Sequence, residues 1–198
     1  EKDTTRARAN TLREFLTNSK RSNKFNHQEL KEVFDLCLSC KACASECPSN
    51  VDVAALKSEF LYQYQEENGY SFRNSMFANN VKYNKIGSLF PSLTNLVLNT
   101  YVTKSIMGIS LKRSVPKLTP KTLKSWYKKQ THSSSKKIIY VFCDEFTNFY
   151  DTEIGKDTII VLKRLGYNPT FIKHQESGRS FISKGFLKEA KEVANKNV

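Results

Sequence analysis

The sequence predicts a mixed fold, in which a mainly helical first part that carries a group of cysteines is followed by a partial α/β domain. Four cysteines fall within eleven residues, between stretches whose apolar residues follow helical spacing. The polar run 128–137 then separates this part from the continuous apolar run 138–143. A helical pattern and a second β-rich run follow, which is the order of a βαβ unit.

These composition changes predict three segments. Residues 1–69 form the helical module around the cysteines, and residues 70–137 form a helical and extended connector that ends in a polar linker. Residues 138–198 form a partial parallel-sheet domain. The predicted fold class is therefore α followed by α/β.

Three helices are expected in the first segment. Residues 1–24 predict a charged helix that begins near Thr4, and residues 26–36 predict a second helix whose apolar residues lie on one side. A third helix should begin after Asp52, which is a good N-cap, and should end at Gly69.

The connector is predicted to be helical but irregular. Its second half, which contains Pro116, Pro120 and the single Trp126, is expected to be largely extended. The aromatic residues of this segment are interpreted as core or docking contacts.

The last segment predicts two parallel strands with a helix between them. Residues 138–143 are expected to form a strand buried on both faces, and the following helix should stop at Gly166. Residues 170–173 supply the second strand, with a right-handed crossover. A final helix is expected over residues 183–195.

The cysteine run carries the clearest chemistry. Cys37, Cys40, Cys43 and Cys47 have the spacing C-x2-C-x2-C-x3-C, and Pro48 follows directly. This is the bacterial ferredoxin-type run, in which thiolates of one short loop reach separate irons of a [4Fe-4S] cluster. The first segment is accordingly predicted to be a helical ferredoxin-type cluster module.

Three other interpretations of these cysteines fit the sequence less well. A structural zinc site usually has two C-x2-C pairs separated by a longer connection, and no second pair or histidine pair follows here. A disulfide framework requires an oxidising compartment and would close strained, very small loops. Buried structural cysteines do not fit the polar residues between them.

Charge and hydropathy limit the class of partner. The chain has 198 residues and a formal net charge of +13, with basic residues in small groups along the sequence. No RNA-binding signature accompanies them, so a solvated lysine-rich surface without nucleic-acid binding is predicted. The apolar neighbourhood 86–109 is interrupted too often to span a membrane, although peripheral membrane association stays open. Five cysteines in this pattern suit a reducing compartment, which predicts a cytoplasmic location.

The order of these features resembles the C-terminal iron–sulfur region of FAD-linked oxidoreductases similar to D-lactate and D-2-hydroxyglutarate dehydrogenases. The matching residues are 5–10, 35–43 and 46–52 in the first half, and Gly178-Arg179 with residues 183–185 in the second. The resemblance implies a [4Fe-4S] module followed by the first half of a cysteine-rich, heterodisulfide reductase-like domain.

Two departures from that family are visible. The family has a cysteine pair immediately before the Gly-Arg step, where this chain has Glu176 and Ser177. The role of that pair therefore does not transfer, and the half-domain is interpreted as structural. Cys143 is interpreted as a small buried hydrophobic residue. The second departure is that this chain shows no flavin domain and no first cysteine run. Both are expected on a missing domain or partner.

The first functional hypothesis is electron transfer. The resemblance implies that Cys37, Cys40, Cys43 and Cys47 hold a [4Fe-4S] cluster that relays electrons from a flavin, FAD on a missing domain or partner, to an acceptor. In two-cluster ferredoxins the fourth cysteine of a run binds the other cluster, so Cys47 is expected to serve a neighbouring cluster. The isolated chain would then hold one labile cluster that Cys47 closes, or no cluster.

No catalytic residue is predicted in this chain. His27, His132 and His174 have no cysteine or carboxylate at a telling spacing. The chain is therefore expected to be part of an oxidoreductase without a complete active site. The alternatives are a zinc-stabilised basic nucleic-acid-binding module and a partner-docking module.

Overall fold

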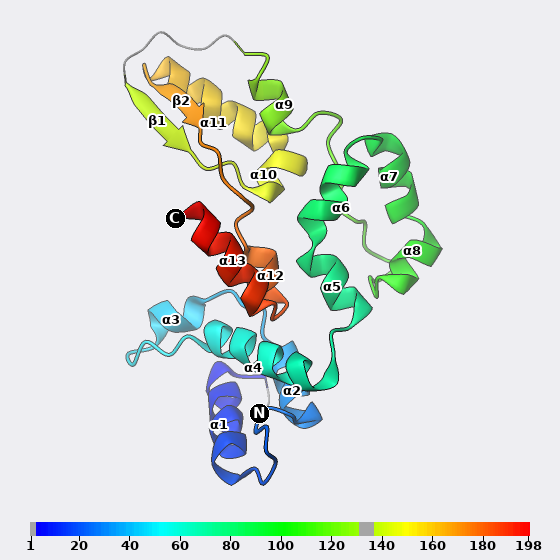
Figure 1. Cartoon of the computed structure of the whole chain (residues 1–198), viewed down its shortest axis with the longest axis vertical. Coiled ribbons are helices and arrows are strands. Elements are labelled where there is room, and N and C mark those ends of the chain that lie inside the picture. Colours follow the sequence, from blue (N-terminus) through cyan, green and yellow to red (C-terminus); the bar gives the residue numbers. More distant parts are fainter. Residues whose placement is uncertain (1–2, 131–136) are drawn as a thin grey trace. The chain divides into compact units, whose positions relative to one another are not determined.

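Two compact units make up the computed structural model, which describes residues 3–130 and 137–198 (Figure 1). One unit, called the cysteine unit below, comprises residues 1–78 and 178–192, and the other, called the sheet unit, comprises residues 79–177 and 193–198. The fold is mainly helical with one small parallel sheet, which confirms the predicted fold class. The three-segment division stays a prediction, and most of the predicted linker, residues 131–136, lies outside the described residues.

The cysteine unit is built from helices. They are α1 (Thr5–Asn18), α2 (Gln28–Asp35), α3 (Ala42–Glu46), α4 (Val53–Asn68), α5 (Phe72–Ala78), α12 (Arg179–Ser183) and the first part of α13 (Leu187–Asn197).

The core of the cysteine unit lies between α1, α2 and α4. The rings of Phe34 and Phe60 stack with centroids 5.1 Å apart, and both side chains are completely buried. Leu12, Leu30 and Val53 complete this core, as the helical spacing of apolar residues predicted. Burying such large side chains is the main favourable term that holds the three helices together.

Capping residues lie at the starts of α1 and α4, as the sequence predicted. The Thr4 hydroxyl accepts the N–H of Ala7 at the start of α1, and Asp52 caps α4 in the same way. Gly69 follows α4 with a positive φ of 82°. Helix α1 ends at Asn18, earlier than the range 1–24 predicted from its charged residues.

The sheet unit combines short helices with two strands. Its elements are α6 (Asn80–Gly87), α7 (Pro91–Leu98), α8 (Tyr101–Ile106), α9 (Leu123–Tyr127), β1 (Ile138–Val141), α10 (Glu145–Phe149), α11 (Thr152–Arg164), β2 (Asn168–Phe171) and the last residues of α13.

The predicted βαβ unit is present. Strands β1 and β2 pair in parallel, with Ile138 opposite Asn168 and Val141 opposite Phe171. Helix α11 connects them, packs against β2 and is followed by Gly166 with a positive φ of 83°. The second strand begins two residues earlier than predicted.

Three details of the prediction are wrong. Strand β1 is not buried on both faces, because a two-stranded sheet with α11 packed against β2 leaves Ile138 and Tyr140 exposed in the described structure. Trp126 lies in helix α9 and not in an extended connector. The last helix is divided, because Gly185 with a φ of +72° separates α12 from α13.

Candidate functional site

The cysteine loop lies between two anchored helices of the cysteine unit. Cys37 directly follows the end of α2, and its N–H donates to the carbonyl of Phe34 at 3.0 Å. Cys43 lies in α3 and packs against the hydrophobic core, while Cys47 ends that helix with an N–H bond of 3.1 Å to the carbonyl of Cys43. Cys40 is exposed in the loop before α3.

Three residues of this loop have left-handed backbone conformations. Ser39, Lys41 and Asn50 have φ values of 56°, 63° and 52°, and within the described residues they are the non-glycine residues with positive φ. Such conformations cost free energy and are found where the surrounding structure demands a tight turn, often at functional sites. Two of these turns lie between successive cysteines of the C-x2-C-x2-C run.

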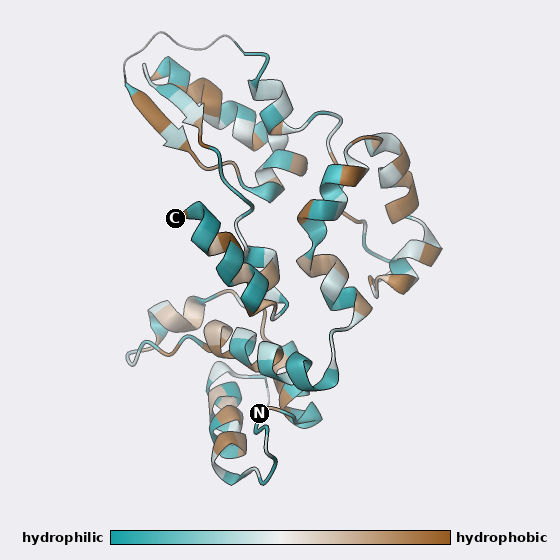
Figure 2. Cartoon of the chain, viewed as in Figure 1, coloured by the Kyte–Doolittle hydropathy of each residue, from teal (hydrophilic) through white to brown (hydrophobic). Residues whose placement is uncertain are grey.

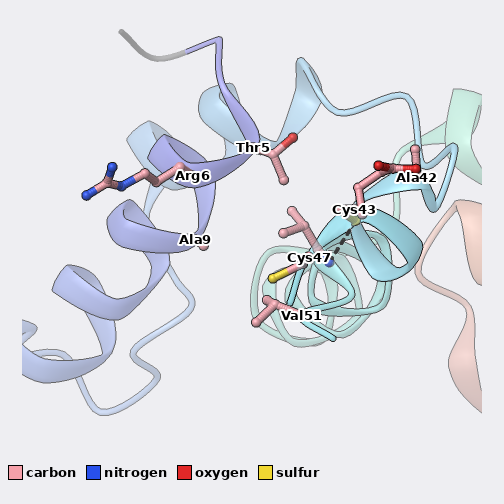
Figure 3. Close-up of a pocket in the computed structure, with 9 residues that line it drawn as sticks. Thr5, Arg6, Ala9, Ala42, Cys43, Cys47 and Val51 are labelled. Carbon is pink, nitrogen blue, oxygen red and sulfur yellow. Dashed lines mark hydrogen bonds between the residues drawn. The ribbon is translucent and has the colours of Figure 1, made fainter. Parts of the chain in front are cut away.

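The four cysteines divide between two neighbouring cavities. Cys37, Cys40 and Cys43 line a cavity of 240 Å³ together with Arg8 from α1. Cys47 and Cys43 line a second cavity of 530 Å³, whose other wall is formed by Thr5 and further residues of α1. Figure 3 shows the sulfur of Cys47 on the side of its helix that faces this second cavity. The structure therefore brings three of the predicted ligands to one cavity and directs the fourth to another.

Backbone N–H groups point at the sulfur atoms. The N–H of Ser39 donates to Cys37 Sγ at 3.4 Å, and the N–H of Val53 donates to Cys43 Sγ at 3.2 Å. At Cys47, backbone N–H groups, that of Val51 first, hold the pKa of the thiol below its usual value. Such donors favour the thiolate form, which is the form that binds metal.

Two positively charged side chains bond to the backbone at the start of the cysteine run, and one of them, Arg8, lines the first cavity. The Lys57 ammonium donates to the carbonyl of Cys37 at 2.6 Å, and partial burial is the main reason that its pKa is lowered. Arg8 Nη2 donates to the carbonyl of Leu36 at 3.1 Å. Arg8 Nε is buried and has no hydrogen-bond partner among the described residues. Buried donors are normally hydrogen-bonded, and a cluster sulfur in the cavity that Arg8 lines would be an acceptor for this one.

The donor chemistry fits an iron–sulfur cluster, but the sulfur atoms are not gathered in a coordination geometry. Within residues 3–130 and 137–198, no three His, Cys, Asp or Glu side chains converge closely enough to hold a metal ion. The ligand role of Cys37, Cys40, Cys43 and Cys47 therefore stays a prediction. The structure adds Arg8 and Lys57, which sequence reasoning missed, although Arg8 lies within the family-like stretch 5–10.

The fifth cysteine lies in the sheet unit, away from the candidate ligands in the sequence. Cys143 is 4% exposed, and burial raises the pKa of its thiol to about 11, so it has the character of a small hydrophobic residue. Its backbone N–H donates to His174 Nε2 at 3.2 Å. This bond ties His174 to the segment that follows β1.

The residues at the position of the missing cysteine pair form part of a hydrogen-bonded corner. The N–H and the hydroxyl of Ser177 donate to the two carboxylate oxygens of Glu145 at 3.0 and 2.6 Å. Burial, with the neighbouring Glu145 carboxylate as a second cause, raises the pKa of Glu176. His27, in the cysteine unit, is 2.7 Å from the Ser19 hydroxyl, and His132 lies outside the described residues.

Comparison with known proteins places iron–sulfur chemistry in the same region. Residues 1–52 match the family described as a 4Fe-4S dicluster domain. D-2-hydroxyglutarate dehydrogenases are similar to most of the chain: the protein from Haemophilus influenzae is 27% identical over 187 residues, that from Pantoea ananatis 28% over 191 and that from Escherichia coli 26% over 198.

The matches cover most of this chain but only a small part of each relative. They include 86%, 87% and 90% of this chain, but only 18%, 18% and 19% of the relatives. The chain therefore spans less than a fifth of the length of these curated relatives. The comparisons confirm the predicted resemblance and support an iron–sulfur part of an oxidoreductase.

No solved structure is significantly similar to the chain. Among the helices of the described residues, none is both long enough and apolar enough to cross a bilayer.

Proposed function

We propose that this chain is the electron-transfer portion of a 2-hydroxy acid dehydrogenase similar to the D-2-hydroxyglutarate dehydrogenases. Cys37, Cys40 and Cys43 supply three thiolates to one [4Fe-4S] cluster. The observation that carries this proposal is that these three cysteines line one cavity, with backbone N–H groups on the sulfurs of Cys37 and Cys43. A bound cluster would supply one-electron oxidation and reduction.

Cys47 has a different role in this proposal. It lies on the second cavity, and in two-cluster ferredoxins the fourth cysteine of a run serves the other cluster. We therefore assign Cys47 to a neighbouring cluster whose remaining ligands come from another cysteine run. The match of residues 1–52 to a dicluster domain supports this assignment.

The residues around the first cavity prepare it for a negatively charged group. Lys57 and Arg8 fix the carbonyls of Cys37 and Leu36, so the backbone that carries the first ligand is held from two sides. Their positive charges also lower the cost of adding an electron at this site. Leu36 and Leu38 are further lining residues and supply apolar surface next to the sulfurs.

The larger reaction requires groups outside this chain. We infer from the family resemblance that the electrons come from FAD on another domain or subunit and pass to a separate acceptor. The substrate, a 2-hydroxy acid, would be oxidised at the flavin. A reducing, cytoplasmic compartment suits the five free cysteines.

Single cysteine substitutions test the ligand assignment. We expect Cys37→Ser, Cys40→Ser and Cys43→Ser each to lose most of the iron that the unaltered chain retains after anaerobic reconstitution, because serine is a poor iron ligand. Cys143→Ala is the matched control and should retain all of it, since Cys143 is buried in the sheet unit. The measurement is iron, sulfide and zinc content per folded chain, with folding checked by circular dichroism.

The Cys47→Ser variant separates the two roles. If Cys47 serves a neighbouring cluster, this variant should keep more iron than Cys40→Ser does. Equal iron loss in Cys143→Ala and Cys40→Ser, or zinc in place of iron in the unaltered chain, would contradict the proposal.

A further inference from the structure

The positive net charge of the chain comes from one stretch of its sequence. From Asn68 to Cys143 the sequence contains no Asp or Glu, but it contains 13 of the 32 Lys and Arg residues. The 19 basic residues that remain equal the 19 acidic residues of the whole chain. The net charge of +13 therefore belongs to this acid-free stretch, and most of the stretch lies in the sheet unit.

The same stretch exposes large apolar side chains. Helices α7 and α8 and the turn before α7 carry seven that are each between 61% and 71% exposed, called the apolar set below: Leu89, Phe90, Leu93, Leu96, Tyr101, Val102 and Ile106. Figure 2 shows the hydrophobic colouring of α7 and α8. Single exposed apolar residues are ordinary, but this number on two short consecutive helices indicates a binding surface.

Hydrogen bonds hold α7 with its apolar side outward. Its polar residues bond to the rest of the sheet unit: the Thr94 hydroxyl donates to the carbonyl of Gly87 at 3.0 Å, and Asn95 exchanges two bonds of 2.8 and 2.9 Å with the backbone of Leu118. Two of the three leucines of the helix, Leu93 and Leu96, remain exposed. This is the reverse of a helix whose apolar face packs on its own core.

A further hydrogen bond holds basic residues near α7. Asn99 accepts the N–H of Val115 at 3.0 Å, so the loop between α8 and α9 is tied to the end of α7. This loop carries Lys112, Arg113 and Lys117, all of which are exposed. Exposed apolar and exposed basic side chains are thus fixed in one part of the sheet unit.

We propose that the apolar set and the basic loop bind the surface of an anionic lipid bilayer. Interfacial binding combines apolar side chains that enter the acyl boundary with Lys and Arg that contact acidic headgroups. A nucleic acid offers no apolar phase for leucine and valine. A protein partner would need an apolar area bordered by acidic side chains to match both the apolar set and the basic loop.

Vesicle binding tests the proposal directly. The chain is mixed with vesicles of phosphatidylcholine alone or of phosphatidylcholine with phosphatidylglycerol, and the bound fraction is measured by co-sedimentation at low and high salt. We expect binding only to the anionic vesicles, weakened by salt because the headgroup attraction is screened. Equal binding to both kinds of vesicle, or to neither, would overturn the proposal.

Matched variants locate the surface. Removing three charges in Lys112→Gln/Arg113→Gln/Lys117→Gln should weaken binding by about a hundredfold, since each basic residue near an anionic surface contributes roughly fivefold. The control Arg164→Gln/Lys191→Gln/Lys196→Gln removes as many exposed charges elsewhere and should bind much more tightly than this variant.

The apolar set is tested in the same way. Leu93→Gln/Leu96→Gln should weaken binding about tenfold or more, whereas Ile154→Gln/Leu165→Gln, at similarly exposed positions of α11 and just after it, should not. If the control variants lost vesicle binding to the same extent, the assignment of the binding surface would be overturned. A dimer that dissociates in Leu93→Gln/Leu96→Gln, without vesicle binding by the unaltered chain, would instead assign the surface to a second copy. Binding to DNA alone would assign it to a polyanion.

Discussion

The cysteines of the run are not equivalent in their surroundings. Cys37 and Cys43 each accept a backbone N–H at sulfur and share a cavity with Cys40, while Cys47 lies on a different cavity. Left-handed turns at Ser39 and Lys41 produce this arrangement, because they reverse the chain between successive cysteines. Spacing alone predicted four ligands, but which cavity each sulfur faces depends on the helices around the loop.

Asp52 fixes the far end of the cysteine loop. Its carboxylate accepts the N–H of Ala55 at 2.9 Å as the cap of α4, and its second oxygen is 3.4 Å from the ammonium of Lys41. The Ala55 N–H is the main cause that lowers the pKa of Asp52, and Lys41 adds to it. The sequence predicted this cap, because an N-cap is decided by a local pattern.

Two substitutions separate the effect of the Asp52 cap on stability from the effect of its charge. Asp52→Ala should lower the free energy of unfolding by about 1 kcal/mol at neutral pH, because the first turn of α4 loses its cap. Asp52→Asn should cost much less, since asparagine is an equally good cap and only the exposed ion pair is lost. Urea unfolding of the three proteins measures both differences.

The pH dependence of this effect has a definite sign. The folded pKa of Asp52 lies below its ordinary value of 3.8, so the stabilisation is complete above that value and is lost as pH falls through the folded pKa. The difference between the unaltered chain and Asp52→Ala should therefore shrink in acid. A difference that stays constant below about pH 3, or none at neutral pH, would show that the carboxylate does not cap α4.

Helix α4 connects the core of the cysteine unit to the C-terminal helices. Phe60 packs against Phe34 on one side of the unit. One turn later, the buried Gln65 donates to the carbonyl of Lys184 at 2.8 Å, in the turn between α12 and α13. Gly185 follows in this turn with a φ of +72°, and a Cβ atom there would lie 2.7 Å from Leu61 Cβ.

Because of this close approach, a substitution at Gly185 tests the packing on α4 directly. Gly185→Ala should lower the free energy of unfolding by about 2 kcal/mol or more, because positive φ and a clash with Leu61 add together. Gly166→Ala is the matched control: it has a positive φ of 83° but open space around it, so about 1 kcal/mol is expected. Equal losses in denaturant unfolding would show that the contact with Leu61 does not constrain the turn.

The errors of the sequence prediction at this scale have physical causes. Helices with local caps and apolar spacing, such as α4, were predicted with their ends, and Gly166 ended α11 as expected. The break at Gly185 was missed because it depends on a contact with Leu61, more than a hundred residues earlier. The exposure of β1 was missed because an apolar run does not reveal how many layers cover it.

At the scale of the whole molecule, two properties lie in different units. The cysteine run and residues 1–52, which match the dicluster domain, belong to the cysteine unit. The apolar set and the basic loop belong to the sheet unit. Each unit has its own hydrophobic core, so substitutions at one surface should leave the other proposal testable.

The proposed substrate oxidation needs groups beyond this chain. The chain spans less than a fifth of the curated relatives, and the proposed substrate oxidation and flavin belong to parts that it does not include. What the chain itself must do, in this account, is to hold iron and sulfide at Cys37, Cys40 and Cys43.

The most direct test is anaerobic reconstitution of the unaltered chain with iron and sulfide, followed by its visible spectrum and its iron and zinc content. Our prediction is a brown protein whose absorption bleaches on reduction and which holds about four irons per chain. A colourless protein that binds one zinc would contradict it, because zinc–thiolate sites carry no electrons. A folded, colourless protein that binds neither metal would also contradict the claim that these three cysteines hold a cluster.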